Sequence, residues 1–152
     1  MREILFRGKR VDNGEWVEGD LVQGIKKQAG MAFIWSESSA PFPLDVFEFK
    51  INPATLGQYT GLTDKNGKKI FGGDVVEQNW YDYNEPIAES FGVVVYCESN
   101  CSFSVMDANE NRIVPLGSCH AYHWEAEVIG NIHDNPELMK GGTTDGDKAD
   151  PV

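Results

Sequence analysis

The sequence predicts a mostly β protein of the β-rich α+β class, with a β-rich N-terminal segment, a small barrel in the second half and one short C-terminal helix. Two tight-turn signals, Asp12–Gly14 and Asp64–Gly67, each lie between strand-like segments. The 16 glycines and short apolar runs favour many turns over long helices. Each half also carries a Gly-Asp pair, Gly19-Asp20 and Gly73-Asp74, followed by two apolar residues. Such a pair predicts the sharp bend that a small barrel needs at a corner.

The first predicted segment covers residues 1–57 and consists of short strands. Apolar residues alternate at Ile4 and Phe6, and the first turn leads into a return strand that bends at Gly19. Two further runs are rich in aromatic and branched residues, which favour strands. Asn52 before Pro53 predicts one helical turn, because Asn caps helices and Pro fits their first position. The expected strands are 2–11, 16–22, 31–35 and 46–51.

The second predicted segment, residues 58–134, forms the barrel. After the turn at 64–67, a strand is expected over residues 70–78. Residues 79–90 are expected to form a loop, rich in acidic and aromatic residues, with Pro86 inside it. Four further strands follow this loop. They are expected at 91–97, 102–106, 112–116 and 123–132.

The last predicted segment, residues 135–152, begins with a short helix. Asn135 and Pro136 repeat the pattern of a capping residue followed by proline. From Lys140 onward the chain has little apolar surface to bury, which predicts a mobile tail.

Residues 58–76 carry a family resemblance. They contain Gln-Tyr-Thr-Gly-Leu, then Asp-Lys-Asn-Gly, then Gly-Asp-Val-Val. This run resembles the YopX family of phage and prophage proteins. The opening Met1–Arg7 and the closing Val128–Leu138 resemble the start and the end of that family, so the resemblance brackets residues 1–138. The structural motif consists of Gln58, Tyr59, Gly61, Asp64, Asn66, Gly67, Gly73 and Asp74.

The resemblance implies a small, largely β protein that is encoded by a phage or prophage and found in the cytoplasm of the bacterial host. It implies no established enzymatic activity and no catalytic residues. The strand-and-glycine pattern from Gln58 to His133 is also similar to SH3-like barrels, with a tight turn, Gly-Asp-Val-Val and a later Gly92–Val95 run. Such folds host many functions, so this pattern predicts architecture alone.

The net charge of -11 is unevenly distributed along the sequence. Residues 1–76 carry ten basic and ten acidic side chains, whereas residues 77–152 carry three basic and fourteen acidic ones. An acidic surface repels phosphate and attracts basic partners, so we expect no nucleic-acid partner. The plainer alternative is that acidic loops and a tail keep the protein soluble.

The longest apolar runs are far too short to span a bilayer, and Met1 is followed by Arg2 and Glu3 without the apolar core of a signal peptide. We therefore expect a cytoplasmic protein with no membrane partner. Three cysteines, an odd number, favour free thiols in that compartment.

Cysteine and histidine side chains supply the strongest candidate for a metal site, since zinc prefers thiolate and imidazole. Their spacing differs from that of zinc ribbons, and Cys97 suits the end of a buried strand equally well. We therefore expect no metal and no cofactor. The candidate residues are Cys97, Cys101, Cys119, His120, His123 and His133.

Other chemistry is weakly supported. Cys119 and His120 are adjacent, so on a strand they face opposite ways, and Cys119 shares a face with His123 only if the segment is fully extended. Glu125 and Glu127 share a face, which alternation with apolar neighbours predicts to be wet. The sequence contains no glycine-rich phosphate loop, and its basic patch is small. That patch consists of Arg7, Lys9, Arg10, Lys26 and Lys27.

The aromatic residues Trp80, Tyr81 and Tyr83, in the predicted loop, are the candidate contact site for a partner. Aromatic side chains on loops offer a large contact area at low entropic cost. The alternative is that these rings cover the edge of the barrel.

We therefore expect a non-enzymatic protein-interaction module of the YopX type, with an unknown protein partner. It is also expected to form homo-oligomers, because exposed strand edges invite self-pairing. The second hypothesis is an acidic inhibitor that imitates the charge of DNA and blocks a host nucleic-acid enzyme. A third and weaker one is a small enzyme or nucleic-acid binder.

Overall fold

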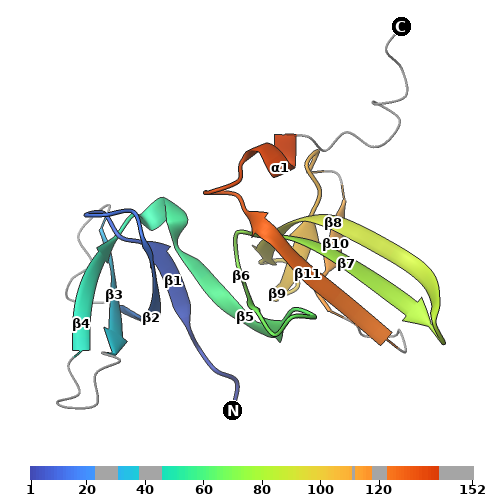
Figure 1. Ribbon diagram of the computed structural model, residues 1–152, viewed down its shortest axis with the longest axis horizontal. Helices are drawn as coiled ribbons and strands as arrows, with labels where there is room; N and C mark the ends of the chain where they lie inside the picture. The colour runs from blue at the N-terminus through green and yellow to red at the C-terminus, as the bar shows by residue number, and fades with distance from the viewer. Residues whose placement is uncertain (23–30, 38–45, 111, 118–122, 141–152) are drawn as a thin grey trace, which may run out of the picture. The chain divides into compact units, whose positions relative to one another are not determined.

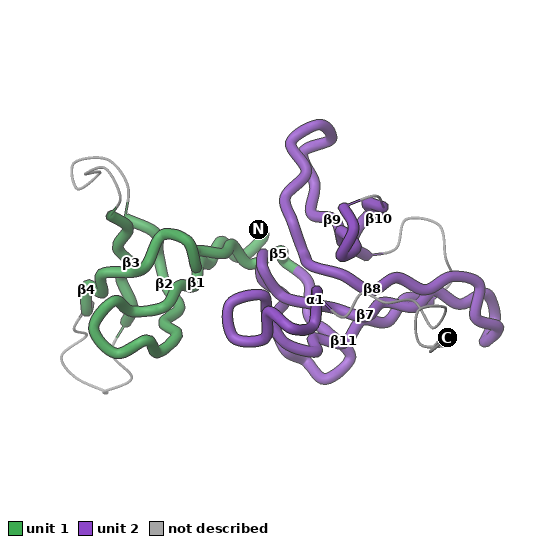
Figure 2. Tube along the Cα trace, turned by 90° about the horizontal axis from the view of Figure 1, so that it is seen from above, with its two compact units in different colours: residues 1–61 green, residues 62–152 purple. Residues whose placement is uncertain are grey.

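The computed structural model describes residues 1–22, 31–37, 46–110, 112–117 and 123–140. The chain divides into two compact units, residues 1–61 and 62–152 (Figure 2). The described residues form two antiparallel sheets, a short 3-10 helix and one short α-helix, so the mostly β prediction is confirmed (Figure 1). None of the described helices is both long and apolar enough to cross a membrane.

The six-stranded sheet has the order β4-β3-β2-β1-β5-β6. Its strands lie close to the predicted ones, and the single helical turn forms with Asn52 as its cap, whose side chain accepts a hydrogen bond from the Ala54 N–H at 3.1 Å. These elements are β1 (Phe6–Lys9), β2 (Trp16–Val22), β3 (Ala32–Glu37), β4 (Val46–Ile51), η1 (Pro53–Thr55), β5 (Gly57–Thr63) and β6 (Lys69–Phe71).

In the first unit, strands β1 to β4 of this sheet curl over a small core. Ile34 and Ile51 are fully buried there. The residues after β1 lie beside the end of β4. Arg10 and Ile51 form a β-bridge, and the Val11 N–H donates to the Lys50 carbonyl at 3.0 Å. Gly8 permits this approach, since a Cβ there would lie 2.1 Å from a side-chain carbon of Ile51.

The five-stranded sheet has the order β10-β9-β8-β7-β11. Its core is formed by Ile70, Val76, Val94, Val105 and Ala126, which are all almost completely buried. The second unit contains β6 and the five strands of this sheet, followed by a short helix. They are β7 (Asp74–Asp82), β8 (Glu85–Cys97), β9 (Ser102–Met106), β10 (Ile113–Pro115), β11 (His123–Asn131) and α1 (Glu137–Lys140).

Two predictions for the second unit need correction. Residues 79–90 are not a loop, because β7 continues to Asp82 and β8 begins at Glu85, so that they form a long hairpin turning at Tyr83 and Asn84. The SH3-like barrel predicted for residues 58–134 is also not found. In the described residues this sheet stays open, with β10 and β11 as its outer strands.

A buried amide ties a chain segment across the core face of the open sheet. The Gln78 side chain is fully buried, donates to the Pro115 carbonyl at 3.2 Å and accepts from the Trp124 indole N–H at 3.1 Å. The Trp80 indole N–H donates to the Gly117 carbonyl at 3.2 Å. Side-chain hydrogen bonds from Gln78 and Trp80 thus hold residues 115–117, at the end of β10, against the core face of β7.

Candidate contact site on the second unit

The motif residues of the sequence mainly perform structural work. The Asp64 Oδ1 atom accepts from the backbone N–H groups of Asn66 and Lys68, both at 2.9 Å, and Oδ2 accepts from the Val128 N–H at 3.1 Å. The next residue, Lys65, donates its N–H to the Ala126 carbonyl at 2.8 Å. The β5–β6 turn thereby occupies hydrogen-bonding groups on the outer edge of β11, and this protects an edge strand from foreign pairing.

The other motif residues support the turns and the core. Gly61, Gly67 and Gly73 have φ values of 89°, 81° and 91°, a region that favours glycine. Asp74 is 1% exposed and its carboxylate accepts from the Phe71 N–H at 2.8 Å, while Tyr59 is buried and Gln58 pairs with Phe6. The motif residues therefore have structural roles in turns, strand pairing and the core.

The three predicted contact residues do not share a surface. Trp80 lies on the core face of β7, opposite Trp124 of β11. Tyr81 lies on the other face, where its ring is 5.6 Å from the His123 ring. Tyr83 lies at the hairpin turn and is 75% exposed, with a φ of 54°. Of the three residues, Tyr83 is the only exposed one, whereas Trp80 and Tyr81 are half-buried.

The side of β7, β8 and β11 that faces away from the core is here called the outer face. Cross-strand pairs define it, because directly paired residues point to the same side. Glu77 pairs with Glu127 and with Phe91, and Tyr81 pairs with His123. The outer face comprises Glu77, Asn79, Tyr81, Glu89, Phe91, His123, Glu125 and Glu127.

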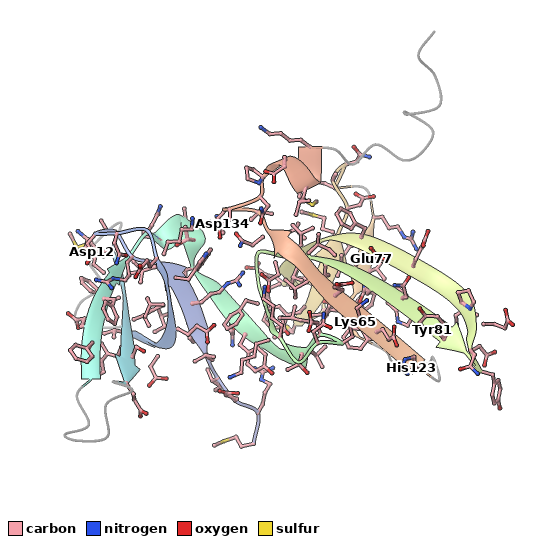
Figure 3. All side chains as sticks on the ribbon, in the orientation of Figure 1. Asp12, Lys65, Glu77, Tyr81, His123 and Asp134 are labelled. Carbon is pink, nitrogen blue, oxygen red and sulfur yellow. The ribbon has the colours of Figure 1, made fainter. Side chains whose placement is uncertain are left out.

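The outer face is acidic. Glu125 and Glu127, which the sequence predicts to lie on the solvent-facing side of their strand, both belong to it. Lys65 forms an ion pair with Glu127 at 2.7 Å, and this hydrogen-bonded carboxylate raises the pKa of Lys65. His123 lies 2.9 Å from Glu125. Both pairs are largely exposed, so they contribute little to stability. Lys65, Glu77, Tyr81 and His123 can be followed along this unit in Figure 3.

An apolar element in this acidic surface was missed by sequence reasoning. Phe91 is 40% exposed on the outer face, and Ile87, near the end of the hairpin, is 58% exposed. Phe91 was predicted to begin a strand, but its orientation was not, because a run such as Phe91–Val95 lacks the strict alternation that separates an inner from an outer face. The carboxylates of this face can attract a basic protein partner, and exposed Phe91 can contact it through its apolar ring.

The metal candidates are spread along the second unit. Cys97 and Cys101 flank the turn between β8 and β9, where the Ser99 hydroxyl near the Cys97 sulfur (3.1 Å) lowers the pKa of that thiol. His123 begins β11, and His133 lies in the turn that follows β11, beside Gly73. Cys119 and His120 fall outside the described residues. Among the residues that are described, no three potential ligands gather around a common point.

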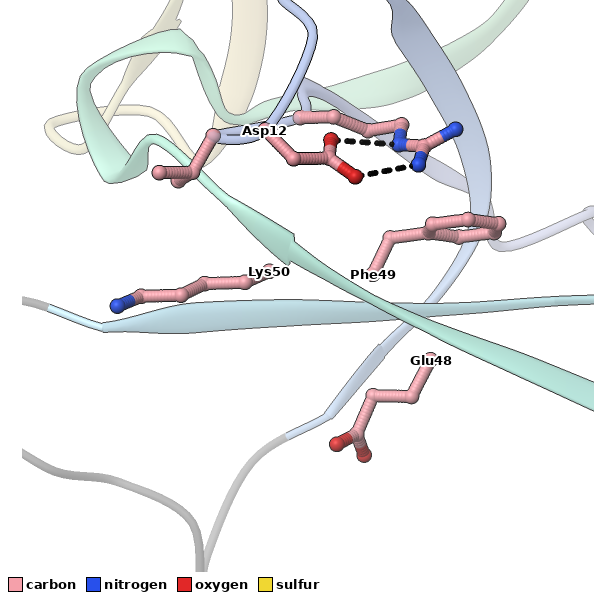
Figure 4. A pocket seen from close by; sticks show the side chains of 6 residues that line it. Asp12, Glu48, Phe49 and Lys50 are labelled. Atoms are coloured by element: carbon pink, nitrogen blue, oxygen red, sulfur yellow. Dashed lines mark hydrogen bonds and ion pairs between the residues drawn. The ribbon is translucent and has the colours of Figure 1, made fainter.

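The described residues of the predicted basic patch contact aromatic and acidic neighbours within the first unit. The Arg7 and Lys9 head groups lie over the Trp16 ring at 4.7 and 5.5 Å. Arg10 lies over the Phe49 ring and binds Asp12 through two hydrogen bonds, which raises the pKa of Arg10 and lowers that of Asp12 (Figure 4). Lys26 and Lys27 fall outside the described residues.

A pocket of about 300 Å³ lies beside this pair in the first unit (Figure 4). Glu48 and Lys50 line it together with the Arg10–Asp12 pair, so its lining carries charges of both signs. Such a mixed lining favours neither phosphate nor a cation, and the pocket adds no candidate chemistry.

The comparisons with known proteins agree with the resemblance of the sequence. The family model described as "YopX protein" matches residues 5–140. The chain belongs to the YopX family. A crystal structure of protein EF1440 from Enterococcus faecalis is similar in fold, with a TM-score of 0.52 and 22% identity, over 91% of this chain and 99% of that one. No curated protein matches the sequence.

Proposed function

We propose that this YopX family protein is a non-enzymatic protein-interaction module that binds a basic protein partner through the outer face of β7, β8 and β11. We further propose that it is encoded by a phage or prophage and acts in the cytoplasm of the bacterial host. The observation that carries the binding proposal is the combination of exposed Phe91 with the carboxylates of Glu77, Glu125 and Glu127 on one face.

Charge distribution supports a basic partner. The net charge of residues 77–152 is -11, equal to that of the whole chain. A carboxylate surface of this kind accelerates encounter with a positively charged protein, and an apolar centre such as Phe91 then stabilises the complex by excluding water. The exposed aromatic ring is what distinguishes this face from acids that serve solubility alone.

The second hypothesis, imitation of DNA charge, is less well supported by this face. Carboxylates two residues apart on one strand lie about 6.6 Å apart, which is a regular spacing. However, Lys65 neutralises Glu127, and Phe91 occupies the position that pairs with Glu77. A surface that imitates phosphates needs an unbroken row of charge, whereas this one alternates charge with an aromatic ring.

Affinity capture from a bacterial lysate, read by mass spectrometry, tests the proposal. The double variant Glu77→Lys with Phe91→Ala should lose the captured basic protein. The matched control, Phe47→Ala with Glu37→Lys, changes the same residue types in the first unit, where Phe47 is 48% exposed, and should retain it. Equal capture by both variants would exclude the outer face as the binding surface.

The captured complex then separates the two hypotheses by salt. A complex centred on Phe91 should weaken by less than tenfold between low and moderate salt, since its apolar part is insensitive to screening. An inhibitor that imitates DNA should lose its nucleic-acid enzyme far more steeply over the same range. The identity of the captured protein, nucleic-acid enzyme or not, gives an independent answer.

A further inference from the structure

The long strand β8 has one edge that is open over its first half. Residues Glu85 to Val93 pair with β7, whereas β9 pairs with β8 only from Val93 to Cys97. Between Glu85 and Gly92, therefore, no strand of the described residues lies on the second edge of β8. Backbone groups in an antiparallel strand point alternately to the two sides, so about half of those in this stretch face the open edge.

The point where β9 leaves β8 is marked by a close approach of the backbone. A Cβ on Gly92 would lie 2.1 Å from the Met106 carbonyl oxygen, so only glycine allows the chain to pass here. Met106 is the last residue of β9 and pairs with Val93. The line of β9 thus ends where the open edge begins, and an incoming strand would continue this line along β8. Figure 1 shows the β7–β8 hairpin extending past β9 and β10.

A small cavity of about 90 Å³ lies at this same point. Ser90 and Phe91 of β8 line it together with Val105 of β9 and Val114 of β10, so the cavity lies between the start of the open edge and the end of β9. Asp107, directly after β9, and Arg112 supply polar groups to its wall. A cavity of this volume has room for one short side chain of an added strand.

The side chains of β8 along the open edge favour pairing with a basic segment. Glu85 and Glu89 are exposed along it, and Ile87 and Phe91 add exposed apolar surface. A second copy of the chain would bring another -11 charge from residues 77–152 to the same place, and the two copies would repel each other. A basic segment, in contrast, is attracted by the negative charge that would repel a second copy.

We propose that the β8 edge from Glu85 to Phe91 binds an extended, basic segment of the partner protein by adding it as a new strand, an inference that rests on the proposed function and names the partner's recognition element. Backbone hydrogen bonds supply affinity in this mode, and alternate side chains supply specificity. Lysine or arginine side chains of the segment meet Glu85 and Glu89, and a short apolar side chain enters the cavity beside Phe91.

The test uses the full chain and fluorescein-labelled heptapeptides of alternating lysine and valine. Two further versions carry N-methyl groups on alternate residues, one version for each register, and a fourth replaces lysine by glutamate. Fluorescence anisotropy should show binding of the unmodified peptide. One N-methylated version should lose at least tenfold in affinity because it lacks the N–H groups that face β8, and the glutamate peptide should not bind.

Variants and hydrogen exchange locate the binding. Glu89→Lys should weaken the unmodified peptide severalfold, whereas Glu98→Lys, an exposed control in the β8–β9 turn, should leave it unchanged. The peptide should slow amide exchange within residues 85–91.

Three results would overturn the proposal: no binding of the unmodified peptide, equal binding of both N-methylated versions, or a dimer in sedimentation that protects residues 85–91 without peptide. Equal binding of the methylated versions would leave capture by the outer face intact, so the two proposals fail separately.

Discussion

The two Gly-Asp pairs of the chain form corners in both units, but for different physical reasons. At Gly19-Asp20 the strand β2 changes partner, since Gly19 pairs with β1 and Asp20 with β3. At Gly73-Asp74 the chain turns from β6 into β7. Gly19 is needed for space, because a Cβ would lie 2.0 Å from the Trp35 carbonyl oxygen, whereas Gly73 is needed for its φ of 91°.

The two aspartates differ even more. Asp20 is exposed and no role in the corner is evident, whereas Asp74 is 1% exposed and accepts the Phe71 N–H. A repeated dipeptide therefore indicates a repeated bend without indicating which atom enforces it. The first unit enforces its corner by close packing, and the second by a buried carboxylate.

Gly19→Ala should have the largest effect on stability, because a backbone carbonyl cannot rotate away from the new methyl group as a side chain can. We expect a loss of about 3 kcal/mol in the free energy of unfolding, at the upper end of the usual cost of overpacking. Urea denaturation of the whole chain measures it. A loss below about 1 kcal/mol would mean that β2 and β3 separate easily at the corner.

Asp74→Ala should be next, and Asp20→Ala is its matched control. Removing the buried carboxylate leaves the Phe71 N–H without this acceptor, which costs about 2 kcal/mol for a hydrogen bond to a charged group. Asp20→Ala should change stability by less than about 0.5 kcal/mol, as exposed substitutions do. Equal effects of the two substitutions would remove the distinction between the corners.

Gly73→Ala should cost less than Gly19→Ala, because a Cβ at Gly73 meets the His133 ring at an ordinary 3.5 Å. Only the left-handed backbone then resists the substitution, by about 1–2 kcal/mol. Gly73→Asn should recover part of this loss, since Asn tolerates the left-handed region better than Ala. If Asn were worse than Ala, space and not φ would be limiting at this corner as well.

Local sequence signals predicted most of the elements and missed their long-range arrangement. The strands 16–22 and 46–51 have the predicted bounds, because turn residues and β-branched or aromatic side chains specify them locally. The hairpin at 79–90 was missed because its turn places Tyr83 and Asn84 at positive φ, where sequence reasoning looks for glycine. Pro86 further concealed it, although proline is tolerated near a strand end beside an open edge.

The barrel and the contact site were harder to predict for one shared reason. Whether a sheet closes depends on pairing between distant strands, and here the end of β10 is bound to β7 through the buried Gln78 side chain and not through strand pairing. Likewise, Phe91 belongs to a run that looks like a core strand, and only its cross-strand partner Glu77 shows that it faces outward. Neither partner is visible in a local pattern.

The smallest expected effect concerns Asp64 of the second unit, whose carboxylate should make stability depend on pH. Burial opposes the ionised form of Asp64, but the N–H groups of Val128, Lys68 and Asn66 outweigh it and lower its pKa. The pKa is thus lower in the folded than in the unfolded chain. This stabilisation is fully present above the unfolded pKa of about 3.9 and is lost as the pH falls through the folded value.

Asp64→Asn should cost about 1 kcal/mol at pH 7, because the amide group that replaces Oδ2 faces a backbone N–H. It should also flatten the loss of stability of the chain below about pH 4. Asp12→Asn is the control in the first unit: the pKa of Asp12 is lowered as well, but through Arg10 at an exposed site. Urea denaturation between pH 2.5 and 7 compares the three proteins. An equally steep acid loss in the wild type and Asp64→Asn would show that the turn at 64–67 does not depend on this carboxylate, so the second unit would owe its closed edge to the Lys65–Ala126 backbone bond alone.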